Sequence, residues 1–208
     1  MYSLLYNILR SVLAQDERGH IIGKAYIYTF SKDWTGWEET SILTSPDAQR
    51  NSEFGFSVSI HNGTVAVGAP FAGPSGSVCV YECSDAGPEE GTACVETAKI
   101  VALDASEFGG SLSMHGDILA IGAPSTPTQT SSGPGIGGGV YVYKGKADSW
   151  SLLNKFKYPG TESFGRSIGI SDTILASSDP VYYKPNSKMK SGAAFAVDYL
   201  LTNQTTLC

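Results

Sequence analysis

The sequence predicts an all-β protein, a β-propeller-like array of four-stranded antiparallel blades. The main observation is an internal repeat, because the dipeptide Phe-Gly recurs after 54 and then after 56 residues. The second is that Gly-Ala-Pro, or a changed form of it, follows each Phe by 14 residues. The third is a glycine followed by an alternating run of β-branched and aromatic residues in every unit. Four short strands per unit at this period are typical of propeller blades.

These markers define the residues of the repeat motif. The Phe-Gly pairs are Phe54-Gly55, Phe108-Gly109 and Phe164-Gly165. The second marker reads Gly68-Ala69-Pro70, Gly122-Ala123-Pro124 and, in a changed form, Ser178-Asp179-Pro180. The alternating run begins at Gly76, Gly139 and Gly192, and an earlier copy at Gly23 has no Phe-Gly before it. We expect each Phe ring to pack on a glycine-lined corner, because glycine leaves room for close approach.

The alternation of side chains places four strands in each unit. The first begins at Phe-Gly, as in 54–60, where Val58 and Ile60 share one face of the strand and Ser57 takes the other. Asn62-Gly63 forms the hairpin turn that follows, because both turn residues tolerate positive φ. The second strand ends at Pro, which cannot donate to a ladder. The second strands are expected at 64–67, 118–121 and 173–176, and the fourth at 37–43, 97–102 and 150–156.

We expect one domain over residues 1–208. It divides into a partial blade at 1–50, blades at 51–104 and 105–160, and a blade at 161–208 that lacks a clear fourth strand. Residues 8–14 fit a degraded second strand of the partial blade, and the apolar opening stretch 1–14, which has no basic residues at its start, is also a candidate signal peptide. The sequence therefore contains about 3.5–4 blades, and propellers close with ~4–8. Three arrangements fit this number: an open arc or fragment of a larger propeller, which we favour, a small closed ring, or half of a self-associated assembly.

Composition excludes several classes of protein. The net charge of −6 disfavours binding to a nucleic-acid backbone. No run of 18 apolar residues is present, so we expect no membrane-spanning helix. Hydrophobic residues make up 41% of the chain, which is enough for a packed core, and the 24 glycines suit short strands and tight turns.

Cysteines and sequons favour an extracellular or cell-surface location. Cys83 and Cys94 flank a loop rich in Gly, Pro and acidic residues, and a hairpin there would bring them together as a disulfide. Cys79 alternates with apolar neighbours, as a core residue does. The sequons at Asn62 and Asn203 make both asparagines candidates for glycosylation. Disulfides persist in oxidising compartments, and N-glycosylation also takes place on secreted proteins, so the two features favour the same location.

The three markers together resemble FG-GAP repeats, the blades of the integrin α-subunit propeller and of its bacterial and protist relatives. The resemblance covers roughly residues 20–200 and implies a propeller fold. Many integrin blades also carry a calcium loop between their first two strands, with several carboxylates and a glycine. Here the corresponding connections are two or three residues long, and Asp117 and Asp172 each stand alone. We therefore expect no metal site and no cofactor.

The sequence shows no catalytic constellation, so we expect a protein that is not an enzyme. His61 and His115 are 54 residues apart and hold equivalent turn positions, which indicates repeat inheritance. The expected function is a non-catalytic binding or adhesion module that recognises a protein or glycan through the blade-linking segments and the connections between second and third strands. The alternatives are a propeller domain accessory to or derived from an enzyme of the glycan lyase or phospholipase type, or a structural fragment of a larger propeller.

The candidate ligand-binding residues lie in those connections. The connection between the second and third strands of the last unit is basic and aromatic, and such side chains suit a sugar or an acidic protein surface. Acidic residues recur just before the Phe-Gly pairs and offer a rim for a cation or a basic partner. The candidates are Tyr182, Tyr183, Lys184, Lys188, Lys190, Glu53 and Glu107.

Overall fold

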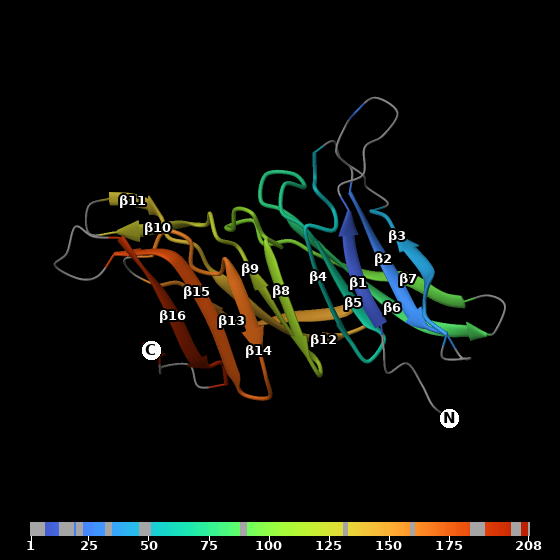
Figure 1. Cartoon of the computed structure of the whole chain (residues 1–208). Coiled ribbons are helices and arrows are strands. Elements are labelled where there is room, and N and C mark those ends of the chain that lie inside the picture. The colour runs from blue at the N-terminus through green and yellow to red at the C-terminus, as the bar shows by residue number, and fades with distance from the viewer. Residues whose placement is uncertain are drawn as a thin grey trace.

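The computed structural model is an all-β protein, as the sequence predicts. It describes residues 7–12, 19, 23–31, 35–45, 51–87, 91–130, 133–158, 161–183, 190–200 and 205–207. Regular structure in these residues consists entirely of strands, β1 to β17. The strands form antiparallel sheets that follow one another in chain order, with the first and last sheets at opposite ends of the molecule (Figure 1).

Four of the sheets are the predicted blades. Blade 1 consists of β1 (Asn7–Val12), β2 (Lys24–Phe30) and β3 (Trp37–Leu43). Blade 2 consists of β4 (Ser57–His61), β5 (Thr64–Ala69), β6 (Ser77–Gly87) and β7 (Gly91–Ile100). Blade 3 consists of β8 (Ser111–His115), β9 (Ile118–Gly122), β12 (Val140–Lys146) and β13 (Ser149–Phe156). Blade 4 consists of β14 (Ser167–Ile170), β15 (Ile174–Tyr183), β16 (Lys190–Asp198) and β17 (Thr205–Leu207).

The first and last blades differ in how closely the sequence anticipates them. In blade 1, β1 overlaps the predicted degraded strand at 8–14 and pairs along its whole length with β2. In blade 4, a fourth strand is present where the sequence shows no clear one, because β17 pairs with β16 from Phe195 to Val197. This strand is short and mostly threonine, so it lacks the alternating apolar pattern that marks the other fourth strands.

Two connections between second and third strands are more regular than expected. The glycine-rich stretch between β9 and β12, which the sequence suggests is a loop, contains a two-stranded hairpin of β10 (Pro127–Thr130) and β11 (Gly133–Ile136). Between β15 and β16, the ladder continues past a bulge to the pair Tyr183 and Lys190. The sequence does not predict the first hairpin, because its strands are rich in proline and glycine and so lack the alternation of apolar and polar side chains that marks a strand.

The motif Phe residues hold equivalent positions between successive blades. Phe54, Phe108 and Phe164 have exposed fractions of 1%, 0% and 0%. Phe108 forms an isolated parallel bridge with Gly76 of the preceding blade, and Phe164 forms the same bridge with Gly138. A Cβ atom on either glycine would overlap the backbone of the Phe opposite. The Phe-Gly turn of one blade thus packs directly on the backbone of the preceding blade and joins the two. We call the buried Phe of this turn the Phe wedge.

Within the part of the chain that the structure describes, the core consists of three clusters, one between each pair of neighbouring blades. In each cluster, small β-branched or alanine side chains from one blade pack against the motif Phe and larger side chains of the next. These smaller partners are Ala25 and Ile27 for Phe54, then Ala66, Val78 and Val80 for Phe108, and Ala120, Val140 and Val142 for Phe164. At about 1.5–3 kcal/mol for each large side chain buried, these clusters supply most of the free energy that holds the blades together.

Candidate functional site

The antiparallel order of each blade divides its connections between two ends. The blade-linking segments lie at the same end as the connections β5–β6, β9–β12 and β15–β16, which we call the linker end. The hairpin turns β4–β5, β8–β9 and β14–β15 lie at the opposite end with β6–β7 and β12–β13, which we call the turn end. In Figure 1 the β10–β11 hairpin stands at the linker end, at the upper left.

Three of the basic and aromatic candidates, Tyr182, Tyr183 and Lys190, belong to the linker end of blade 4. The backbones of Tyr182 and Tyr183 pair with Ser191 and Lys190, so the structure brings three of the predicted residues together at the end of one ladder. Lys184 and Lys188 lie outside the described residues. The ladder of β15 and β16 continues past the bulge after Asp179 and ends at the pair Tyr183 and Lys190.

Glu53 and Glu107 occupy equivalent turns just before Phe-Gly. Both have positive φ, 52° and 58°. The carbonyl oxygen of Glu53 accepts a hydrogen bond from the amide of Phe56 at 2.9 Å, and that of Glu107 accepts one from Gly110 at 3.0 Å. Their backbones therefore form the turn that presents the Phe wedge, and both residues are half-buried. This structural role is one that sequence reasoning did not assign to them.

Exposed apolar side chains at the linker end are the feature that the sequence analysis missed. Leu103, in the segment that links blade 2 to blade 3, is 88% exposed, and Val101 is 45% exposed. Both line a shallow hollow of about 180 Å³ with residues of the short β5–β6 connection. In that connection Phe71 is 45% exposed and contacts Phe56 edge-on, with ring centroids 6.5 Å apart. The run Val-Ala-Leu, directly after the last strand residue of blade 2, was the signal available in the sequence.

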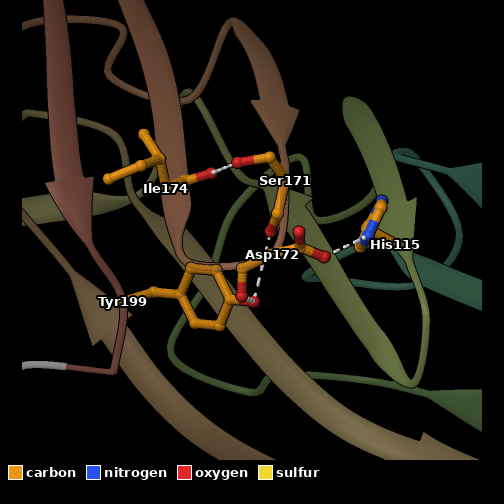
Figure 2. A network of polar contacts seen from close by, with 5 residues as sticks. All are labelled: His115, Ser171, Asp172, Ile174 and Tyr199. Carbon is orange, nitrogen blue, oxygen red and sulfur yellow. Dashed lines mark hydrogen bonds and ion pairs between the residues drawn. The ribbon is translucent and has the colours of Figure 1, made fainter.

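A polar network joins blades 3 and 4 at the turn end (Figure 2). His115 Nε2 lies 2.7 Å from Asp172 Oδ1. The Tyr199 hydroxyl donates to the carbonyl oxygens of Asp172, at 2.5 Å, and Ser171, at 3.2 Å. On the other side of His115, its ring centroid lies 5.2 Å from that of His61 in blade 2. His61 and His115 hold equivalent turn positions in blades 2 and 3, and the row continues into blade 4 through Asp172, the residue after the equivalent position Ser171.

Asp179 explains the changed marker of blade 4. It replaces the Ala of Gly-Ala-Pro and has no exposed surface. Its carboxylate accepts hydrogen bonds from the amides of Glu162, Ser163 and Val181, at 2.9, 3.2 and 2.8 Å. Three backbone donors satisfy a buried carboxylate. The substitution therefore fastens the linker before Phe164 to the end of β15.

The largest pKa shifts are those of tyrosines buried between blades. Burial raises the pKa of Tyr141 to about 12 and also raises the pKa values of Tyr81 and Tyr143. All three hydroxyls lie in the clusters between blades, so the shifts report burial. Among the described residues, no three His, Cys, Asp or Glu side chains lie together in a way that could hold a metal ion. No helix in the described part of the chain is long and apolar enough to cross a membrane.

The predicted disulfide is confirmed. Cys83 and Cys94 lie opposite each other on β6 and β7, with a Cα–Cα distance of 4.1 Å, and are bonded. Cys79 is buried in the cluster between blades 1 and 2, as expected. Asn62 lies exposed in the β4–β5 turn, and Asn203 lies outside the described residues. A disulfide in a repeat of this kind is typical of extracellular proteins.

Comparison with known proteins agrees with the geometry. The family model described as the FG-GAP repeat matches residues 37–81, which extend from β3 of blade 1 to the middle of β6 in blade 2. No curated protein matches the sequence. The matched segment contains Phe54-Gly55 and Gly68-Ala69-Pro70, and blades 3 and 4 repeat its plan. Residues 37–81 of this chain match the FG-GAP repeat, and the chain is built of β-propeller-type blades.

Proposed function

We propose that this chain is a non-catalytic binding or adhesion module that recognises a protein or a glycan through its linker end. The observation that carries the proposal is the contrast between constant blades and variable connections. The three complete sheets share one strand order, whereas the connections at the linker end are a short loop in blade 2, a β10–β11 hairpin in blade 3 and an extended ladder in blade 4. Variable loops on a repeated scaffold are where recognition residues concentrate.

The exposed apolar side chains of the linker end support this proposal. A side chain as exposed as Leu103 contributes nothing to the core, and with Val101 and Phe71 it adds apolar surface to the same end of blade 2. Such surface, with Lys99 beside the hollow, is characteristic of interaction sites. Tyr182, Tyr183 and the lysines that follow them would add stacking and charge at blade 4, where a sugar or an acidic protein surface fits.

The extracellular location belongs to the same proposal. The Cys83–Cys94 disulfide supports an oxidising compartment, and an extracellular ligand would meet the protein there. The absence of an enzymatic role is likewise a proposal. It is supported by the cause of the large tyrosine pKa shifts, which is burial between blades.

The experiment is a binding screen on two separate patches of the linker end. Residues 1–208 would be applied to a printed glycan array and to a panel of purified extracellular matrix proteins. We expect binding to at least one of these probes to weaken tenfold or more in Phe71→Ser/Leu103→Ser, or in Tyr182→Ala/Tyr183→Ala/Lys184→Ala. The matched control is Leu152→Ser, which changes a residue 51% exposed on β13, away from both patches.

The outcomes separate the proposal from its alternatives. Binding that both linker-end variants retain and Leu152→Ser abolishes would place recognition elsewhere and contradict the assignment. Absence of binding to every probe by a well-folded protein would favour a structural role. Circular dichroism of each variant checks that loss of binding does not reflect loss of fold.

A further inference from the structure

A cleft lies at the turn end, between blades 2 and 3 and opposite the linker end. Its volume is about 350 Å³, near the lower limit of the ~300–1,000 Å³ of small-molecule sites. Asn62 in the β4–β5 turn and Glu82 on β6 belong to its blade 2 wall. Asp117, Lys146 and Trp150, from the β8–β9 and β12–β13 hairpins, belong to its blade 3 wall. We call it the turn-end cleft.

The lining of the turn-end cleft suits a sugar ring. The Trp150 indole packs against the core cluster between the two blades, and its Nε1 donates to the carbonyl oxygen of Ala147 at 2.9 Å. Because that N–H is already bonded within the protein, the ring offers the cleft an apolar surface. Glu82 and Asp117 add acceptors and Lys146 adds donors around it. A sugar presents apolar C–H faces and polar hydroxyls, and this combination matches both parts of the lining.

Asn62 is one of the residues that line the cleft. It is exposed and has φ of 48°, a conformation that asparagine tolerates well in a two-residue hairpin turn. Gly63 and Thr64 follow it and complete an N-glycosylation sequon. In the folded protein, Thr64 Oγ1 donates to Glu82 Oε1 at 3.0 Å. A glycan on Asn62 would therefore start at the cleft itself.

We propose that Asn62 carries an N-linked glycan whose first sugars fold back into the turn-end cleft against Trp150 and join blades 2 and 3. In the modification, Asn62 Nδ2 forms a bond to the anomeric carbon of a lipid-diphosphate-linked sugar. The bond from that carbon to the diphosphate breaks, and the diphosphate leaves with the electron pair while Nδ2 loses one proton. The lipid-linked oligosaccharide is the co-reactant and glycosyl donor, and no redox change takes place.

Tethering is what favours the protein's own glycan over a free saccharide. The cleft is open and shallow, so a sugar from solution would bind it weakly. A group attached by a short flexible link experiences an effective concentration in the millimolar range. At this effective concentration the attached sugar occupies the weak site, and a free saccharide at lower concentration does not displace it. This inference uses only the secretory location that the disulfide supports and is independent of recognition at the linker end.

The first test is occupancy. The chain would be secreted from cultured eukaryotic cells, and the peptide containing Asn62 would be weighed by mass spectrometry before and after release of N-glycans by an amidase. We expect Asn62 to be occupied. An unmodified Asn62, whether or not Asn203 carries a glycan, overturns the proposal.

The second test asks whether the glycan contacts Trp150. The melting temperature would be measured for wild type and Trp150→Ala, each with its glycan and as the unglycosylated bacterial product. We expect Trp150→Ala to lower the melting temperature by about 2–4 °C more in the glycosylated form, and Asn62→Asp to abolish that difference. Comparing bacterial wild type with bacterial Asn62→Asp measures the effect of the substitution itself. Trp37→Ala, an exposed tryptophan of blade 1, is the matched control and should show no dependence on the glycan.

A direct contact measurement keeps the proposal falsifiable if Trp150→Ala fails to fold. Nuclear Overhauser contacts between the first sugar and the Trp150 indole are expected in the glycosylated wild type. Lys146→Ala, which changes an exposed residue of the cleft, should weaken those contacts while the fold remains. An occupied Asn62 without such contacts, together with equal losses in melting temperature for both forms of Trp150→Ala, would show a solvent-exposed glycan and contradict the proposal.

Discussion

The hydroxyl of Ser111 donates a hydrogen bond to the carbonyl oxygen of Gly165 in the next blade, at 2.8 Å. Ser57 makes the same bond to Gly109 one blade earlier, at 2.5 Å. Both acceptor glycines have φ near +90°, at 91° and 93°. The first strand of each blade is thereby fixed to the Phe-Gly turn of its successor. Close approach of backbones is as much a part of the repeat as burial of the Phe ring.

Adding a methyl group at this contact should separate two blades. A Cβ on Gly122 would overlap the carbonyl oxygen of Gly165, and neither backbone can move without disturbing the wedge. We expect Gly122→Ala to lower the free energy of unfolding by about 3 kcal/mol, measured by urea denaturation. Gly169→Ala is the control, because the space around that position is open, and its effect should lie within about 0.5 kcal/mol. Equal effects of the two substitutions would contradict the close approach.

Truncating a motif phenylalanine should cost far more than truncating an exposed one. Phe108 has no exposed surface and contacts Tyr141 edge-on with ring centroids 5.3 Å apart. We expect Phe108→Ala to lower the free energy of unfolding by about 3–5 kcal/mol. Phe71→Ala, at a residue 45% exposed, should cost less than about 1 kcal/mol. Denaturation curves of the two variants, compared with wild type, give both numbers, and a small loss for Phe108→Ala would mean that the wedge does not carry the interface.

The sequence could predict the blades because their information is local. Each motif specifies a turn or a strand end within a few residues, as Phe-Gly, Asn62-Gly63 and Gly-Ala-Pro show. The spacings of 54 and 56 residues then show that the same unit is repeated. The disulfide was predictable for the same reason, since Cys83 and Cys94 belong to one hairpin. Where local information is weak, as in the threonines of β17, the fourth strand of blade 4 could not be recognised.

The candidate sites could be predicted only in part, because they depend on how blades pack. Tyr183 and Lys190 are close in sequence, and the structure pairs them. Trp150 and Asn62 are 88 residues apart, and only the relative placement of two sheets brings them to one cleft. Exposure is likewise a tertiary property: the run Val101-Ala102-Leu103 is visible in the sequence, but only the structure shows that Leu103 is 88% exposed.

Removing the disulfide should weaken blade 2. The bond closes a loop with a sequence separation of 11 residues. In the chain-entropy model, Cys83→Ala/Cys94→Ala should lower the free energy of unfolding by about 3 kcal/mol. Thermal denaturation of wild type with and without dithiothreitol should show a matching loss. Insensitivity of the wild type to the reductant, with a confirmed loss of the bond, would contradict the expected contribution.

The buried tyrosines should make the protein sensitive to alkali. An unfolded tyrosine titrates near pH 10, whereas burial raises the pKa of Tyr141 to about 12 and that of Tyr81 further. A raised pKa in the folded state means that this contribution to stability is intact below pH ~10 and is lost as the pH rises through ~12. We therefore expect phenolate absorbance and unfolding to rise together above pH ~10, with a shallower pH dependence in Tyr141→Phe. Phenolate absorbance that appears near pH 10 in the folded wild type and is missing in Tyr141→Phe would contradict the burial of Tyr141.

The most direct test of the repeated blade-to-blade contact is hydrogen exchange at two amides. The amide of Met114 donates to Ser59 Oγ at 3.0 Å, and the amide of Ile170 donates to Ser113 Oγ at 3.1 Å, each across one interface. Exchange followed by nuclear magnetic resonance should show both amides protected in the wild type. Ser59→Ala should speed exchange at Met114 alone, and Ser113→Ala at Ile170 alone. Unprotected amides, or no selective response to either substitution, would contradict the account of blades joined by one repeated interface.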